Sequence, residues 1–109
     1  MVYLILLLVL FFPLTVQADY GTGQQWLEKL NSPMTEDKID AKVMVGNILF
    51  AWEGKSHCKP SLATLGQAVA ITKKFLDENP QFWHEEVSNL IGTALGIVWP
   101  CPIQDKDRR

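Results

Sequence analysis

The chain has 109 residues, with 10 basic and 12 acidic side chains that give a formal net charge of −2 at pH 7. The basic residues are scattered, and their one cluster, at Lys106, Arg108 and Arg109, is interleaved with acids, so we expect no nucleic-acid-binding surface. A chain of this length is sufficient for one domain and too short for two.

Residues 1–18 differ in composition from the rest of the chain. They contain no charged side chain, and residues 4–10 are a continuous run of Leu, Ile and Val. The small side chains of Val16 and Ala18 suit the positions that signal peptidases require, so we predict a signal peptide cleaved between Ala18 and Asp19. The alternative is an uncleaved membrane anchor, because the segment reaches the lower limit of the roughly 17–25 residues that span a bilayer. Cleavage leaves residues 19–109 as one exported domain without a membrane segment.

Helix-type spacing recurs along residues 19–109, and no strand-type alternation persists. Thr22 with Gln25, and Thr64 with Gln67, each fit a capping box, in which the two side chains satisfy amides at a helix start. The first helix is expected to stop near residues 31–33. The helix that begins at Thr64 is expected to stop at residues 79–80, because proline disfavours helical geometry in the residue before it.

A longer helix is predicted between these two, from about Thr35 to Gly54, with Glu36 and Asp37 in its first turn. Gly46 inside this helix suggests that another backbone passes close by. The apolar residues cover more than one stripe, which predicts a central and largely buried helix. They are Ile39, Val43, Met44, Ile48, Phe50, Ala51 and Trp52.

The last predicted helix has the most regular apolar period of all, with Glu85 and Glu86 in its first turn. Its apolar residues are Trp83, Val87, Leu90, Ile91, Ala94, Leu95 and Val98. The prolines at 100 and 102 are expected to end it. The predicted fold is therefore all-α, a small bundle of about four helices joined by short loops.

Two cysteines, Cys58 and Cys101, fall in the predicted mature domain. Because an exported chain enters an oxidising compartment and an even count favours pairing, we predict one structural disulfide between them. Two other roles for these cysteines are open. One is a thiol enzyme in which His57 activates Cys58. The other is a zinc site formed by the two cysteines with His57 and His84, although the spacing of these residues matches no known site. The sequence gives no positive evidence of catalysis or of a cofactor.

The second half of the chain carries a series of motifs that is typical of one family. They are Cys58-x-Pro60, Thr64-x-Gly66-Gln67, Phe75-Leu76-x-x-Asn79-Pro80, His84 and Ala94-Leu95-x-x-x-Trp99-Pro100-Cys101-Pro102. This pattern resembles the Rap/Tai-type immunity proteins associated with type VI secretion. Residues 45–48 with Ala51 resemble the family's glycine-containing central helix. Many relatives carry a second cysteine pair, at positions that correspond here to Leu30 and Val43.

The resemblance implies a non-enzymatic periplasmic protein that binds a toxin, typically a peptidoglycan amidase, blocks its active site and can form a homodimer. As the region that contacts the toxin, we predict the polar loop that contains Glu53, Lys55, Ser56, His57 and Lys59. The alternative function is a periplasmic acid-stress or holdase-type chaperone, because such proteins are also small, helical and held by one disulfide. A chaperone would act on many unrelated clients at low pH, whereas an immunity protein acts on one toxin.

Overall fold

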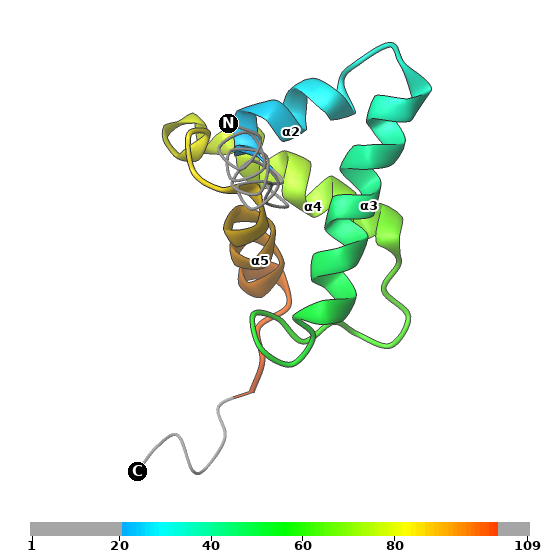
Figure 1. Ribbon diagram of the computed structural model, residues 1–109. Helices are drawn as coiled ribbons and strands as arrows, with labels where there is room; N and C mark the ends of the chain where they lie inside the picture. Colours follow the sequence, from blue (N-terminus) through cyan, green and yellow to red (C-terminus); the bar gives the residue numbers. More distant parts are fainter. Residues whose placement is uncertain (1–20, 103–109) are drawn as a thin grey trace, which may run out of the picture.

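The computed structural model describes residues 21–102, which form four α-helices and one short 3-10 helix (Figure 1). The α-helices are α2 (Gly23–Leu30), α3 (Thr35–Ala51), α4 (Leu65–Glu78) and α5 (Val87–Val98), and the 3-10 helix is η2 (Pro80–Phe82). No strand is present in this part of the chain, so the predicted all-α fold is confirmed. The predicted signal peptide and the basic tail lie outside the described residues. No helix within residues 21–102 has both the length and the apolar character that a bilayer span requires.

The helix starts follow the predicted capping boxes. Thr22 Oγ1 accepts the amide of Gln25 at 3.3 Å, and Gln25 Oε1 accepts the amide of Thr22 at 2.9 Å. Thr64 and Gln67 repeat this exchange at 3.1 and 2.9 Å. Each box satisfies two of the amide groups that a helix start leaves without an intrahelical partner. Both sequence signals therefore act locally, between residues three positions apart.

Two helix boundaries differ from the predicted ones. Helix α3 ends at Ala51, three residues before Gly54, because the chain turns back on itself after Trp52. Helix α5 begins at Val87 with Glu86 as its N-cap, so Glu85 and Glu86 precede its first turn.

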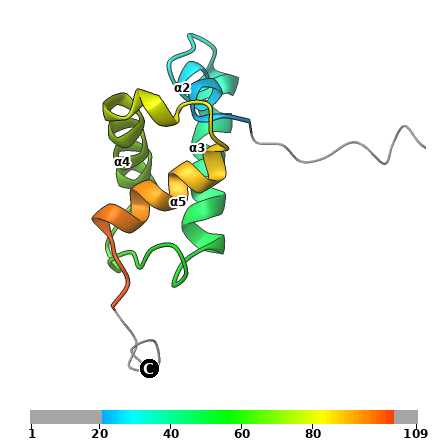
Figure 2. The same cartoon turned by 90° about the vertical axis from the view of Figure 1, so that its left-hand side faces the viewer.

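Helices α3, α4 and α5 pack against one another, and α2 lies across the end of this group that contains the start of α3 (Figures 1 and 2). Trp26 of α2 is completely buried at this junction, and its indole N–H donates to the carbonyl of Ala41 at 2.9 Å. Leu49, Leu76 and Ile91 are among the largest buried side chains of the other three helices. One continuous core thus joins all four helices.

The prediction that α3 is largely buried is wrong. One side of α3 enters the core, whereas Ile39 and Val43 are each 51% exposed and Phe50 is 70% exposed. Helices α2, α4 and α5 pack on the same side of α3, and no described element covers the other side. Gly46 also differs from expectation: a Cβ there would meet only the Leu65 side chain, at 3.6 Å, and no passing backbone.

We predict that Trp26→Phe lowers the free energy of unfolding by about 1–3 kcal/mol, because it removes a buried hydrogen bond and part of the packing around it. Urea unfolding followed by circular dichroism measures this loss. Trp99→Phe is the matched control, since the half-buried Trp99 indole has no hydrogen-bond partner within residues 21–102. Equal losses in the two variants would contradict a special contribution of the Trp26–Ala41 bond.

Candidate partner-binding loop

Residues 52–59 leave the end of α3 and lie beside the end of α5 (Figure 1), and we refer to them as the tethered loop. A disulfide joins Cys58 of this loop to Cys101, with the two Cα atoms 4.8 Å apart. The amide of Cys58 also donates to the carbonyl of Trp99 at 2.8 Å. The predicted cysteine pairing is present in the structure, and it connects the middle of the chain to its C-terminal segment.

Two glycines of α5, Gly92 and Gly96, form the surface on which the tethered loop rests, and we call them the seat. A Cβ added at Gly96 would collide with the carbonyl oxygen of Ser56. A Cβ at Gly92 would lie 3.0 Å from the ring of Trp52 and 3.3 Å from Ser56 Cβ. Only glycine therefore lets the loop backbone approach the helix this closely. The Gly-x-x-x-Gly spacing within α5 is the sequence signal for this contact, and it was missed as a predictor of the loop's position.

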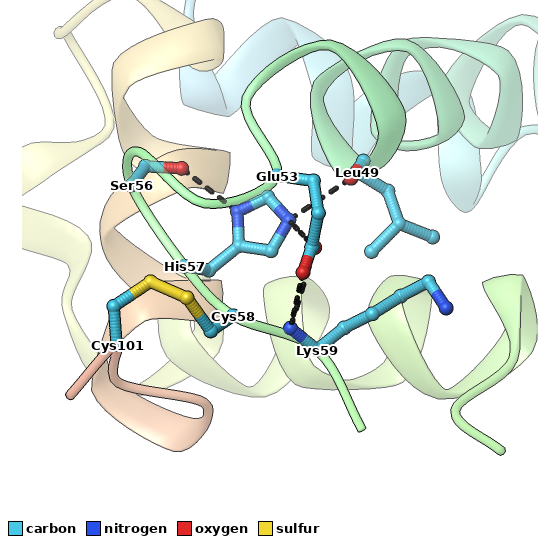
Figure 3. Close-up of polar contacts among 7 residues, drawn as sticks. All are labelled: Leu49, Glu53, Ser56, His57, Cys58, Lys59 and Cys101. Carbon is cyan, nitrogen blue, oxygen red and sulfur yellow. Dashed lines mark hydrogen bonds and ion pairs between the residues drawn. A yellow bond between two sulfur atoms is a disulfide. The ribbon is translucent and has the colours of Figure 1, made fainter. Parts of the chain in front are cut away.

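The side chain of His57 points into the protein and is completely buried (Figure 3). Its Nε2 lies 3.0 Å from the carbonyl oxygen of Leu49 and 3.2 Å from Oε2 of Glu53. Both of these oxygens are acceptors, so Nε2 carries the hydrogen. Nδ1 lies 2.8 Å from Ser56 Oγ, and these two atoms share a hydrogen bond. The ring thus joins the last turn of α3 to two residues of the loop.

The backbone of the tethered loop is closed by its own hydrogen bonds. The amides of Lys55 and Ser56 donate to the carbonyl of Trp52 at 2.9 and 3.1 Å, and the amide of Gly54 donates to the carbonyl of His57 at 2.7 Å. Gly54 has a φ of +83°, a left-handed conformation that favours glycine. These bonds leave Gly54 and Lys55 at the outer end of the loop, and we call these two residues the tip.

The five residues predicted to contact a partner differ in their accessibility. Lys55 is exposed, and its amine has no acidic partner within residues 21–102. Glu53 is also exposed, but its carboxylate accepts the amide of Lys59 at 3.0 Å and faces His57. Ser56 and Lys59 are half-buried, and the His57 side chain is enclosed. A partner can therefore reach Lys55 most directly, and the role of the loop in binding stays a prediction.

The order Ser56–His57–Glu53 has the connectivity of a nucleophile, a base and an orienting carboxylate. Such a group also needs free donors to stabilise an oxyanion. The amides of Lys55 and Ser56 already donate to the carbonyl of Trp52. We therefore interpret the cluster as a structural network.

Both cysteines of the chain are in the disulfide, so no thiol is available for the thiol-enzyme hypothesis. Within residues 21–102, no group of three or more His, Cys, Asp or Glu side chains is arranged to hold a metal ion. The zinc site proposed from His57, His84 and the two cysteines does not form in this structure, because the cysteines bond to each other.

Comparison with known proteins identifies a family that matches most of the chain. Residues 22–101 match the model of a family described as Rap1a immunity proteins, and this match spans all four helices and both cysteines. No curated protein and no solved structure matches the chain.

We predict that replacing both cysteines with serine lowers the free energy of unfolding by about 4 kcal/mol, because the bridge closes a long loop in the unfolded chain. The cysteines are 43 positions apart in sequence. Urea unfolding with and without a reducing agent measures the effect. The reductant should destabilise the wild-type protein to a similar degree and leave the double variant unchanged; a variant as stable as the oxidised protein would contradict a structural role for the bridge.

Proposed function

Because the chain belongs to the Rap1a immunity protein family, we propose that it binds and inhibits a peptidoglycan amidase toxin delivered by type VI secretion. Family membership gives the chain an immunity-type function directed against a toxin protein. The match over residues 22–101 is the observation that carries the proposal. The choice of an amidase rests on the resemblance of the motifs between Cys58 and Pro102 to the Rap/Tai-type proteins.

We propose that the protein acts in the periplasm. The charge-free leader, with a predicted cleavage site after Ala18, supports export. The disulfide between Cys58 and Cys101 supports an oxidising compartment, since such bonds are rare in reducing ones. A peptidoglycan amidase acts on the same side of the inner membrane, so inhibitor and toxin would meet there.

The proposed mechanism is occlusion of the toxin's active-site cleft by the tethered loop. The tip protrudes from a segment whose backbone is already hydrogen-bonded, so it can enter a cleft without first losing conformational freedom. The amine of Lys55, which has no acidic partner within residues 21–102, can donate to acceptors in that cleft. The protein supplies no chemistry in this mechanism, and its contribution is to exclude substrate.

We also propose that the exposed side of α3 forms a homodimer interface. Val43, Gly46, Asn47, Phe50 and Ala51 line a shallow hollow on this side of the helix. Gly46 and Phe50 both line this hollow, and the ring of Phe50 is 70% exposed. A two-fold pairing would let Phe50 of each copy fill the hollow of the other.

The same exposed apolar side favours the second candidate function, a holdase-type chaperone. Ile39, Val43 and Phe50 offer the kind of apolar contact that unfolded clients bind. The two functions differ in selectivity. A chaperone would suppress the aggregation of unrelated proteins at low pH, and an inhibitor would not.

The first experiment is capture from periplasmic extract on oxidised, purified protein comprising residues 19–109. The extract comes from cells that receive type VI effectors, and bound proteins are identified by mass spectrometry. One stoichiometric partner that hydrolyses peptidoglycan, and loses that activity in the complex, would support the proposal. Many substoichiometric clients, increasing at acid pH, would support the chaperone function instead.

We predict that Lys55→Ala weakens binding to the captured toxin by about tenfold, because it removes a charged donor from the centre of the contact. Isothermal titration calorimetry measures the affinity. Lys74→Ala is the matched control, since Lys74 is exposed on α4 and lies 4.0 Å from Glu78. If both variants bind as tightly as the wild type, the tip does not lie in the interface.

We predict that Phe50→Glu converts a dimer to a monomer and changes the free energy of unfolding of the monomer by less than about 0.5 kcal/mol, because the ring is exposed. Sedimentation velocity measures the oligomeric state. Leu62→Glu serves as the control, since Leu62 is 90% exposed but lies in the loop before α4. If the wild-type protein sediments as a monomer at high concentration, the proposed dimer is wrong.

A further inference from the structure

Lys55 is the exposed side chain of the tethered loop that makes no hydrogen bond or ion pair within residues 21–102, whereas Glu53, Ser56 and His57 bond to other groups of the protein. His57 contributes no exposed surface, and the carboxylate of Glu53 points back to His57 and to the amide of Lys59. This distribution separates the residues that can touch a partner from those that determine where the tip lies.

The inner side of the loop is fixed at two independent places. At the first, the His57 ring bonds to the carbonyl of Leu49 in the last turn of α3, at 3.0 Å, and to Ser56 Oγ, at 2.8 Å. At the second, the carbonyl of Ser56 lies against Gly96, so closely that a methyl group could not be placed between them. One contact sets the loop relative to α3 and the other sets it relative to α5.

The disulfide does not replace these contacts. It joins Cys58 to Cys101, beyond the turn that carries the tip. A segment held only at its two ends, by the end of α3 and by the disulfide at Cys58, would still rotate about the bonds of residues 53–57. The contacts of His57, and the contact of Ser56 with the seat, fall within this segment and restrict that rotation.

We infer that the tethered loop has its binding conformation before a partner arrives, and that Gly92, Gly96 and His57 position the tip without touching the partner. This inference rests on the proposed role of the tip in toxin binding. Pre-organisation matters because ordering a flexible loop on binding reduces affinity. A displacement of the loop on α5 would move Lys55 while leaving every side chain of the loop unchanged.

Gly96→Ala tests the inference directly, because it changes no residue of the loop. Gly66→Ala is the matched control: Gly66 is also helical, and a Cβ there meets only Thr64 Oγ1, at 3.8 Å. Gly92→Ala is the milder second variant, because the side chains of Trp52 and Ser56 can give way where the carbonyl facing Gly96 cannot. Leu76→Ala destabilises the core without touching the loop, since Leu76 is buried on α4, and separates a loss of stability from a loss of positioning.

The first measurement is hydrogen exchange of the free, oxidised protein, and it requires no toxin. The amides of Lys55 and Ser56, which donate to Trp52 in the structure, should be protected in the wild type and in Gly66→Ala. They should exchange at least about tenfold faster in Gly96→Ala, with a smaller change in Gly92→Ala, while the core amides of α3 and α5 stay protected. Unprotected loop amides in the wild-type protein would overturn the inference and leave the proposed function intact.

The second measurement is the binding of each folded variant to the captured amidase. We expect Gly96→Ala to weaken affinity by about tenfold or more, mainly through faster dissociation. Gly66→Ala and Leu76→Ala should bind as the wild type does. If Gly96→Ala loosens the loop but binds normally, the positioning role is wrong; if no toxin is captured, the proposed function fails and the exchange result still decides whether the loop is pre-formed.

Discussion

The contact between the tethered loop and helix α5 is the constraint on which the candidate binding region depends. A chain segment withdrawn from water must pair its backbone amides and carbonyls. Here the pairing is achieved within the loop, by Cys58 with Trp99, and by His57 with Leu49. The absence of a Cβ at Gly96 is what permits this arrangement, because any larger residue would separate the loop from the helix.

The parts of the fold that could be predicted from the sequence depend on residues close together along the chain. The boxes at Thr22 and Thr64 are made by side chains three residues apart, and both helices begin where expected. The end of α4 before Pro80 follows from the geometry of one dipeptide. The cysteine pairing followed from the count and the expected compartment, with no knowledge of distance.

The errors concern burial, which depends on how many elements are available to cover a surface. Helix α3 carries apolar residues on more than one side, as a fully buried helix does. The other three helices of residues 21–102, however, pack on only one side of it. His57 illustrates the opposite error. A polar residue in a polar loop was expected at the surface, and its burial became possible because Leu49 and Ser56 provide partners for both ring nitrogens. Neither outcome is visible in a sequence pattern, since both require the final arrangement of the helices.

The position of Lys55 has a consequence for how such a protein could change its target. Its backbone amide helps to close the loop, but its side chain makes no hydrogen bond or ion pair with any residue from 21 to 102. The residue there can therefore vary in charge, size or polarity without disturbing the network beneath it. Under the proposed function, the residue that contacts the partner is one that the fold does not depend on, while the residues that hold the loop in place are shielded from the partner. A protein with this arrangement could therefore come to bind a different toxin through a single substitution at this position and keep the same fold.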